Sequence, residues 1–107
     1  MIEAPPYPDE ERRLASLREL QLLDTPLDVR FERVTRMVRH LLGVPVAIFN
    51  LIDADRQHYK SVQGLDAVDA PKPHAFCTHA LLTDRMLLVA DARCDERFAD
   101  NPFVTGA

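Results

Sequence analysis

The sequence predicts one domain that mixes helices and strands, of the α/β (α+β) class. Two segments in the first half place apolar residues at the three- and four-residue spacings of amphipathic helices. Residues 46–52 are apolar at six of seven positions. Turn residues and a more polar run follow them, which is typical of a β-hairpin. A length of 107 residues suits a single domain with a sizeable core and leaves no room for a second one.

Composition and charge exclude several functional classes. Apolar residues make up 47% of the chain and charged residues 28%, as in ordinary globular proteins. The net charge of -4 comes from interleaved acids and bases, so no basic stripe predicts nucleic-acid binding. No apolar run reaches the ~18 residues of a membrane span, and residues 1–8 lack signal-peptide features. We therefore expect a cytoplasmic protein in which Cys77 and Cys94 are free thiols.

Two helices are expected before the hairpin. Residues 1–8 hold three prolines and should form an irregular lead-in, which places the folded domain at residues 9–107. Asp9 can cap a first helix that runs to about Leu23, and Asp28 can cap a second helix that ends at Gly43. The second helix is expected to pack on the sheet through its apolar stripe, which includes Phe31, Val34, Val38 and Leu41.

The strands are predicted from their apolar residues. Residues 46–52 show no alternation, so they should form a central strand that is covered on both faces. Asn50 is then an anomaly, because a buried amide must find hydrogen-bond partners or line a pocket. Residues 57–64 should form the exposed second strand of the hairpin. A loop over residues 65–73, a short helix over 75–82 and a third buried strand over 86–90 follow.

The polar stretch after the third strand allows two interpretations. Asp91, Asp95, Arg97 and Asn101 can form a ligand or metal patch. Alternatively, they fix a turn through bonds from side chain to backbone, with Phe98 as its apolar anchor. The spacing favours the second interpretation, and Asp95 can cap a helical turn over residues 96–98.

Four short stretches, in their order along the chain, resemble the GAF domains of bacterial sensor histidine kinases and GGDEF-type diguanylate cyclases. They are Leu23-Asp24-Thr25-Pro26, Asp53-x-Asp55-Arg56-Gln57, Phe76-Cys77-x-His79-Ala80-Leu81 and Asp91-Ala92-x-x-Asp95-x-Arg97-Phe98-Ala99-Asp100-Asn101-Pro102.

The resemblance implies a central antiparallel sheet with helices packed on one face and a small-molecule pocket, or a closed pseudo-pocket, on the other. The family's domain continues beyond the equivalent of Ala107. We therefore expect the sheet to be incomplete at the C-terminus, with strand edges that face a gap. We also expect the 107 residues to be a piece of a longer polypeptide, unstable or self-associating when made alone.

Several residues are candidates for lining such a pocket, and no catalytic residue, metal or cofactor is expected. Cys77 and His79 are two positions apart, which on a helix separates their side chains by about 200°. That angle disfavours a shared metal or a thiolate activated by the histidine. We expect a packed cysteine and a histidine whose hydrogen bond caps a helix or tethers a loop. The ligand-pocket candidates are Asn50, Phe76, Cys77, His79, Asp91, Phe98 and Asn101.

The predicted function is regulatory, without enzymatic activity of its own. The module should bind a small effector of unknown identity, or a partner helix, and control a kinase or cyclase output domain outside this chain. A homodimer through the first helix is expected, because Leu14, Leu17 and Leu20 form a narrow apolar stripe. Two alternatives stay open: a small thiol-dependent reductase similar to the methionine sulfoxide reductases of this fold, and a dimerisation module without a ligand.

Overall fold

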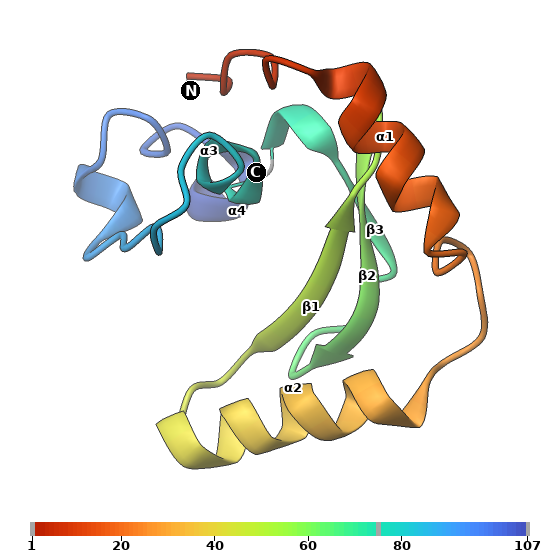
Figure 1. Cartoon of the computed structure of the whole chain (residues 1–107). Coiled ribbons are helices and arrows are strands. Elements are labelled where there is room, and N and C mark those ends of the chain that lie inside the picture. Colours follow the sequence, from red (N-terminus) through yellow and green to blue (C-terminus); the bar gives the residue numbers. More distant parts are fainter. Residues whose placement is uncertain (1, 75, 107) are drawn as a thin grey trace.

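The computed structural model describes residues 2–74 and 76–106, which form an open three-stranded sheet with helices on both sides (Figure 1). The sheet is antiparallel throughout, in the order β1-β2-β3. The predicted α+β class is thus confirmed. In chain order the elements are α1 Glu10–Glu19, α2 Val29–Leu42, β1 Ala47–Ile52, β2 Arg56–Gln63, β3 Asp69–Pro71, a 3-10 turn Lys72–His74, α3 Cys77–Ala80, a 3-10 turn Ala92–Cys94 and α4 Pro102–Thr105.

Both long helices begin where the sequence predicts. The Asp9 side chain accepts a hydrogen bond from a first-turn N–H at 3.4 Å, and the Asp28 side chain accepts one at 2.9 Å. These bonds satisfy N–H groups that have no partner inside the helix. Helix α2 ends at Gly43, whose φ of 62° is the left-handed conformation that glycine adopts without strain.

Helix α1 ends at Glu19, earlier than the predicted end at Leu23. Gln21 and Asp24 have φ angles of 54° and 57°, and such left-handed residues interrupt a right-handed helix. The connection to α2 is therefore an ordered turn.

The hairpin is confirmed, but its two strands exchange the predicted roles. Strand β1 lies at an edge of the sheet, and the polar strand β2 lies in the middle because β3 pairs with its far side. Residues 69–71, predicted as loop, form β3. Ile48 on β1 is 37% exposed, whereas four polar residues of β2 are at most 5% exposed. These four are Gln57, His58, Lys60 and Ser61.

Residues 86–90 do not form the predicted third strand. They are extended without strand pairing, and Met86 and Leu88 are 89% and 82% exposed. An apolar run becomes a buried strand only where another surface covers it, and in this run only Leu87 and Val89 are half-buried. The predicted helix over 75–82 is shorter, since α3 spans Cys77–Ala80, and its expected first residue, Ala75, lies outside the described residues.

Helix α2 meets the sheet through a polar contact. Thr35 is 2% exposed, and its hydroxyl lies 2.7 Å from the hydroxyl of Ser61 on β2. Glu32 accepts hydrogen bonds from Ser61 at 2.6 Å and from Gln63 at 3.1 Å. The Phe31 ring packs beside them, with its centroid 4.6 Å from that of a β1 phenylalanine.

The apolar stripe predicted to cover the sheet does so only in part. Phe31 and Val38 are half-buried, but Val34 and Leu41 are 43% and 72% exposed. The helix is turned toward Thr35, because the hydroxyl and amide groups of β2 offer hydrogen bonds there. The prediction was therefore wrong for Val34 and Leu41.

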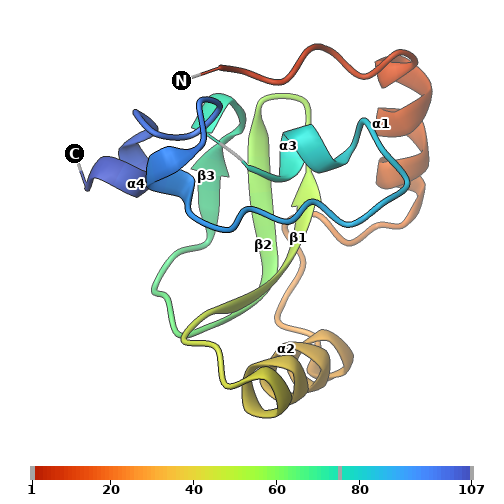
Figure 2. The same ribbon diagram turned by 90° about the vertical axis from the view of Figure 1, so that its left-hand side faces the viewer.

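Figure 2 shows the sheet from the side that α3 covers, with α3 in front of β1. Helices α1 and α3 lie on opposite sides of the strands (Figure 1). The segments that carry the predicted pocket residues therefore gather on the α3 side.

Candidate functional site

Asn50 joins the sheet to α3. Its side-chain nitrogen donates to the side-chain oxygen Oε1 of Gln57 at 2.9 Å and lies 3.5 Å from the Cys77 sulfur. The anomalous amide of β1 is thus half-buried and hydrogen-bonded. Tyr59 is its partner across the strands, and burial raises the pKa of that phenol, with the charge of Cys77 adding to the effect.

An aromatic cluster anchors the polypeptide that follows α3. The Phe98 ring is 1% exposed and stacks on Phe76, with ring centroids 4.2 Å apart and an interplanar angle of 18°. His79 packs edge-on against Phe98 at 5.1 Å. The His79 Nε2 atom donates to the carbonyl oxygen of Ile2 at 3.0 Å. His79 therefore tethers the lead-in, as expected, and Phe98 is the predicted apolar anchor.

The polar residues after residue 90 fix turns. Asp91, Asp95 and Asn101 each accept a hydrogen bond from the backbone N–H two residues later, at 3.0, 2.9 and 2.9 Å. Both aspartates also pair with the arginine two residues later. Those side-chain hydrogen bonds lower the pKa of Asp91, and they lower that of Asp95 to about 2. A ligand role for these residues stays a prediction.

Cys77 and His79 point in different directions. Cys77 contacts Asn50 and is exposed, which corrects the prediction of a packed cysteine. Both cysteines are free and exposed. Among the side chains of residues 2–73 and 76–106, no three His, Cys, Asp or Glu groups gather closely enough to hold a metal ion.

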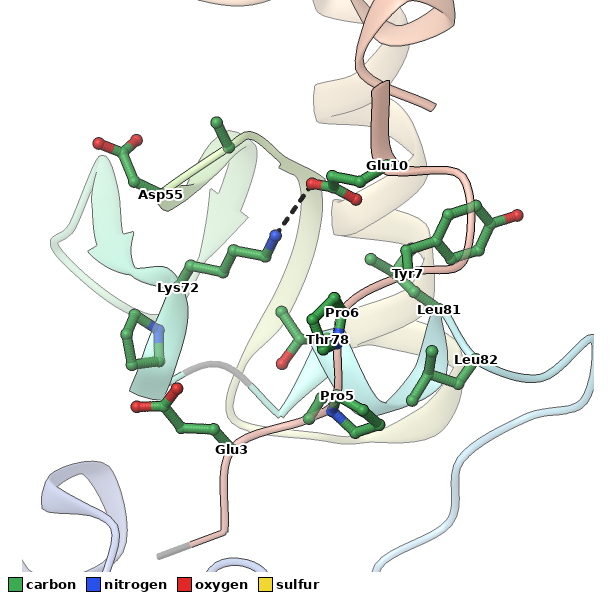
Figure 3. Close-up of a pocket in the computed structure, with 13 residues that line it drawn as sticks. Glu3, Pro5, Pro6, Tyr7, Glu10, Asp55, Lys72, Thr78, Leu81 and Leu82 are labelled. Atoms are coloured by element: carbon green, nitrogen blue, oxygen red, sulfur yellow. Dashed lines mark hydrogen bonds and ion pairs between the residues drawn. The ribbon is translucent and has the colours of Figure 1, made fainter. Parts of the chain in front are cut away.

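A cavity of about 380 Å³ lies between the lead-in, the β1–β2 turn and α3 (Figure 3). It does not include Asn50. Apolar groups line much of it, and the ion pair of Glu10 and Lys72 crosses one side with a distance of 3.0 Å between the carboxylate oxygen and Nζ. The lining consists of Glu3, Ala4, Pro5, Pro6, Tyr7, Glu10, Ala54, Asp55, Lys72, Pro73, Thr78, Leu81 and Leu82.

Glu10 connects this cavity to the first turn of α1. Its carboxylate accepts two hydrogen bonds from Arg13, at 2.6 and 2.7 Å, in addition to the bond from Lys72. The Arg13 hydrogen bonds lower the pKa of Glu10 to about 2, and Lys72 adds to this effect. Arg13 also donates to the backbone oxygen of Ile52 at 2.6 Å. The start of α1 is therefore bound to the end of β1 and to the cavity.

A polar network on β2 was not predicted from the sequence. The Arg56 guanidinium pairs with Asp24 at 2.7 Å, Asp53 at 3.2 Å and Asp69 at 3.0 Å. His58 Nδ1 lies 2.8 Å from the same Asp69 carboxylate. The network joins the α1–α2 connection, the hairpin turn and β3.

Lys60 extends that network toward α2. Its ammonium donates to the Thr25 hydroxyl and to the Pro26 carbonyl oxygen, the second at 2.9 Å. Two of the four family-like stretches, residues 23–26 and 53–57, therefore meet on β2. Their joint occurrence was a signal in the sequence that could have indicated this contact.

The chain's similarity to known proteins agrees with this structure. The family model of the GAF domain matches residues 26–107, so the chain belongs to the GAF domain family. It is a regulatory module of the kind found in signalling proteins. Over 106 residues it is 38% identical to a cyclic di-GMP phosphodiesterase of Pseudomonas aeruginosa.

That match covers 98% of this chain but only 18% of the relative. The relative is named as a phosphodiesterase, whereas the sequence alone predicted a kinase or cyclase output. In the part of the chain that the structure describes, no helix has the length and apolar character needed to cross a membrane.

Proposed function

We propose that this chain is the sensory module of a cytoplasmic bacterial protein that degrades cyclic di-GMP, with no catalysis of its own. The observation that carries this proposal is the 38% identity to a cyclic di-GMP phosphodiesterase along 98% of the chain. The output domain in this proposal is a phosphodiesterase, in place of the kinase or cyclase that the sequence alone suggested.

Regulation by such a module requires an effector that prefers one of two arrangements. The contacts on the α3 side supply a route to α1. His79 holds the lead-in through Ile2, and the lead-in continues directly into α1. Lys72 holds Glu10 in the first turn of α1. An effector that displaces α3 or the lead-in therefore displaces α1, and α1 transmits the change.

A chimera tests this function. The matching segment of the Pseudomonas aeruginosa phosphodiesterase is replaced by this chain, and hydrolysis of cyclic di-GMP is measured. We expect the chimera to hydrolyse its substrate at a rate that changes several-fold with Arg56→Gln, which loosens the α1–α2 connection. Glu96→Gln, at an exposed turn position, should leave the rate unchanged. A chimera whose rate equals that of the enzyme without the segment, for every variant, would contradict the proposal.

We also propose that the module forms a homodimer through α1. Leu14 and Leu17 are only half-buried and Leu20 is 59% exposed, so part of the leucine stripe is available to a second copy. In a protein with Cys77 and Cys94 replaced by serine, Leu20→Cys should form a disulfide-linked dimer under mild oxidation. Glu19→Cys, on the other side of the helix, is the matched control. Equal crosslinking at both positions, or none at any concentration, would reject this interface.

A further inference from the structure

The lead-in covers one side of the cavity, and it is held at both of its ends. At its start, the Ile2 N–H donates to the Arg97 carbonyl oxygen at 3.2 Å, and His79 holds the Ile2 carbonyl. At its end, the capped first turn of α1 is held by Lys72 through Glu10. Prolines in the lead-in restrict the backbone between these points. The cavity is therefore formed before any ligand arrives, which lowers the entropic cost of binding.

The walls divide into an apolar part and an acidic part. Pro5, Pro6, Leu81 and Leu82 supply the apolar surface (Figure 3). Within residues 2–74 and 76–106, the carboxylates of two lining acids, Glu3 and Asp55, have no hydrogen-bond or ion-pair partner. Glu3 lies beside the lower wall and Asp55 at the rim in Figure 3.

The one lysine of the lining does not offset this acidity. The Lys72 ammonium is paired with Glu10 at 3.0 Å, and Glu10 remains ionised at neutral pH because its pKa is about 2. Arg13 binds the same carboxylate, so Lys72, Glu10 and Arg13 together carry one positive charge. The two carboxylates of Glu3 and Asp55 outweigh it, and the remaining negative charge attracts cations and repels anions.

We propose that this cavity binds a small organic cation, an ammonium group on a short apolar body. The ammonium lies at the acidic side near Glu3, and the apolar body packs against Pro5 and Leu82. A volume of about 380 Å³ suits a small molecule of this kind. The proposal deepens the proposed function, on which it rests for its regulatory consequence: a ligand here touches the lead-in, α3 and the first turn of α1.

Three probes of the same shape and different charge test the site: pentylamine, pentanol and pentanoate. Each is titrated into the isotopically labelled 107-residue chain at neutral pH and low salt, and backbone amide resonances are followed by NMR. We expect pentylamine to shift the resonances of Glu3, Leu81 and Leu82, with saturation. Pentanol should shift them weakly and pentanoate should not. Equal shifts with pentanoate, or shifts that map away from the cavity, would overturn the proposal.

Two variants separate charge from shape. Glu3→Gln combined with Asp55→Asn should weaken pentylamine binding about fivefold, as expected for the loss of exposed ion pairs. Glu96→Gln should leave binding unchanged. Ala4→Phe fills the cavity without a change of charge and should abolish the shifts. Unchanged binding in the double variant or in Ala4→Phe would show that the amine lies elsewhere.

The binding experiment and the chimera fail independently. Loss of the amine-dependent shifts, with regulation of the chimera intact, rejects this site and leaves the sensory function standing. Saturable binding, with no effect of the module on hydrolysis, rejects the sensory function and leaves the site standing.

Discussion

Replacing Ser61 with alanine tests the polar contact between α2 and the sheet. The Ser61 side chain is almost fully buried, at 1% exposed. Its hydroxyl donates to the Glu32 carboxylate at 2.6 Å and lies 2.7 Å from the Thr35 hydroxyl. Ser61→Ala removes both hydrogen bonds and leaves only a space the size of one oxygen atom.

The expected loss in the free energy of unfolding depends on the hydrogen bonds that Glu32 and Thr35 retain. A hydrogen bond to a charged group contributes about 1.5 to 3 kcal/mol. Glu32 is half-buried and retains the bond from Gln63, so water offsets part of this loss. Thr35 still reaches backbone carbonyl oxygens at 3.2 and 3.3 Å. We therefore expect Ser61→Ala to lower the free energy of unfolding by about 2 kcal/mol.

Urea unfolding followed by circular dichroism measures this change. A double-mutant cycle with Thr35→Val isolates the bond between the two hydroxyls, because the combined loss should be smaller than the sum of the single losses. Ser16→Ala on the exposed side of α1 is the control and should change stability by less than about 0.5 kcal/mol. A Ser61→Ala protein as stable as the control, or losses that simply add, would refute the described contact.

Three further changes have definite expected outcomes. Val38→Asp should lower the thermal midpoint because it buries part of a charge, whereas Leu41→Asp should not, since Leu41 is 72% exposed; equal losses would mean that the predicted stripe does face the sheet. Gly64→Ala should destabilise by more than about 2 kcal/mol in urea, because at φ 83° its Cβ would lie 1.9 Å from the Pro45 oxygen, and a wild-type midpoint would contradict this geometry. The pKa of Glu10 is lowered from 4.5 to about 2, which means that folding favours its ionised form. This contribution to stability is complete above about pH 4.5 and is lost as the pH falls toward 2. Glu10→Gln should therefore lower stability at neutral pH and lose less of it on acidification; an unchanged pH profile would reject this role.

The features that the sequence predicted correctly depend on interactions between residues that are close in the sequence. Asp9 and Asp28 cap helices through N–H groups two or three positions away, and Gly43 ends α2 through its own backbone. Asp91 and Asp95 fix turns in the same local way. Such short-range chemistry is visible in the sequence because both partners lie in one short window.

The features that the sequence did not predict depend on partners far along the chain. The stacked rings of Phe76 and Phe98 are 22 positions apart (98 − 76), and the Asn50 contact with Cys77 spans 27 positions. No periodicity reports such pairings. The cavity was missed for the same reason, because Ile2 and His79 are 77 positions apart.

The exchange of roles between β1 and β2 has a more general cause. Apolar side chains are unfavourable in water, so a prediction from apolar character places β1 at the centre of the sheet. Burial of β2 depends instead on satisfied polar groups. Lys60 donates hydrogen bonds to Thr25 and Pro26, and Ser61 donates one to Glu32. Each bond offsets the desolvation of a side chain that would otherwise be excluded from the interior.

The same bonds decide how α1 can move in a signalling protein. At its N-terminal end, α1 is held by Arg13 on the oxygen of Ile52. Beyond its C-terminal end, Arg56 of β2 binds Asp24. Lys60 binds the next two residues of the connection. Because both ends of the helix are attached to the hairpin, an effector that acts through α1 must move the helix together with the β1–β2 unit. A hinge at the α1–α2 connection would first have to break the bonds of Arg56 and Lys60.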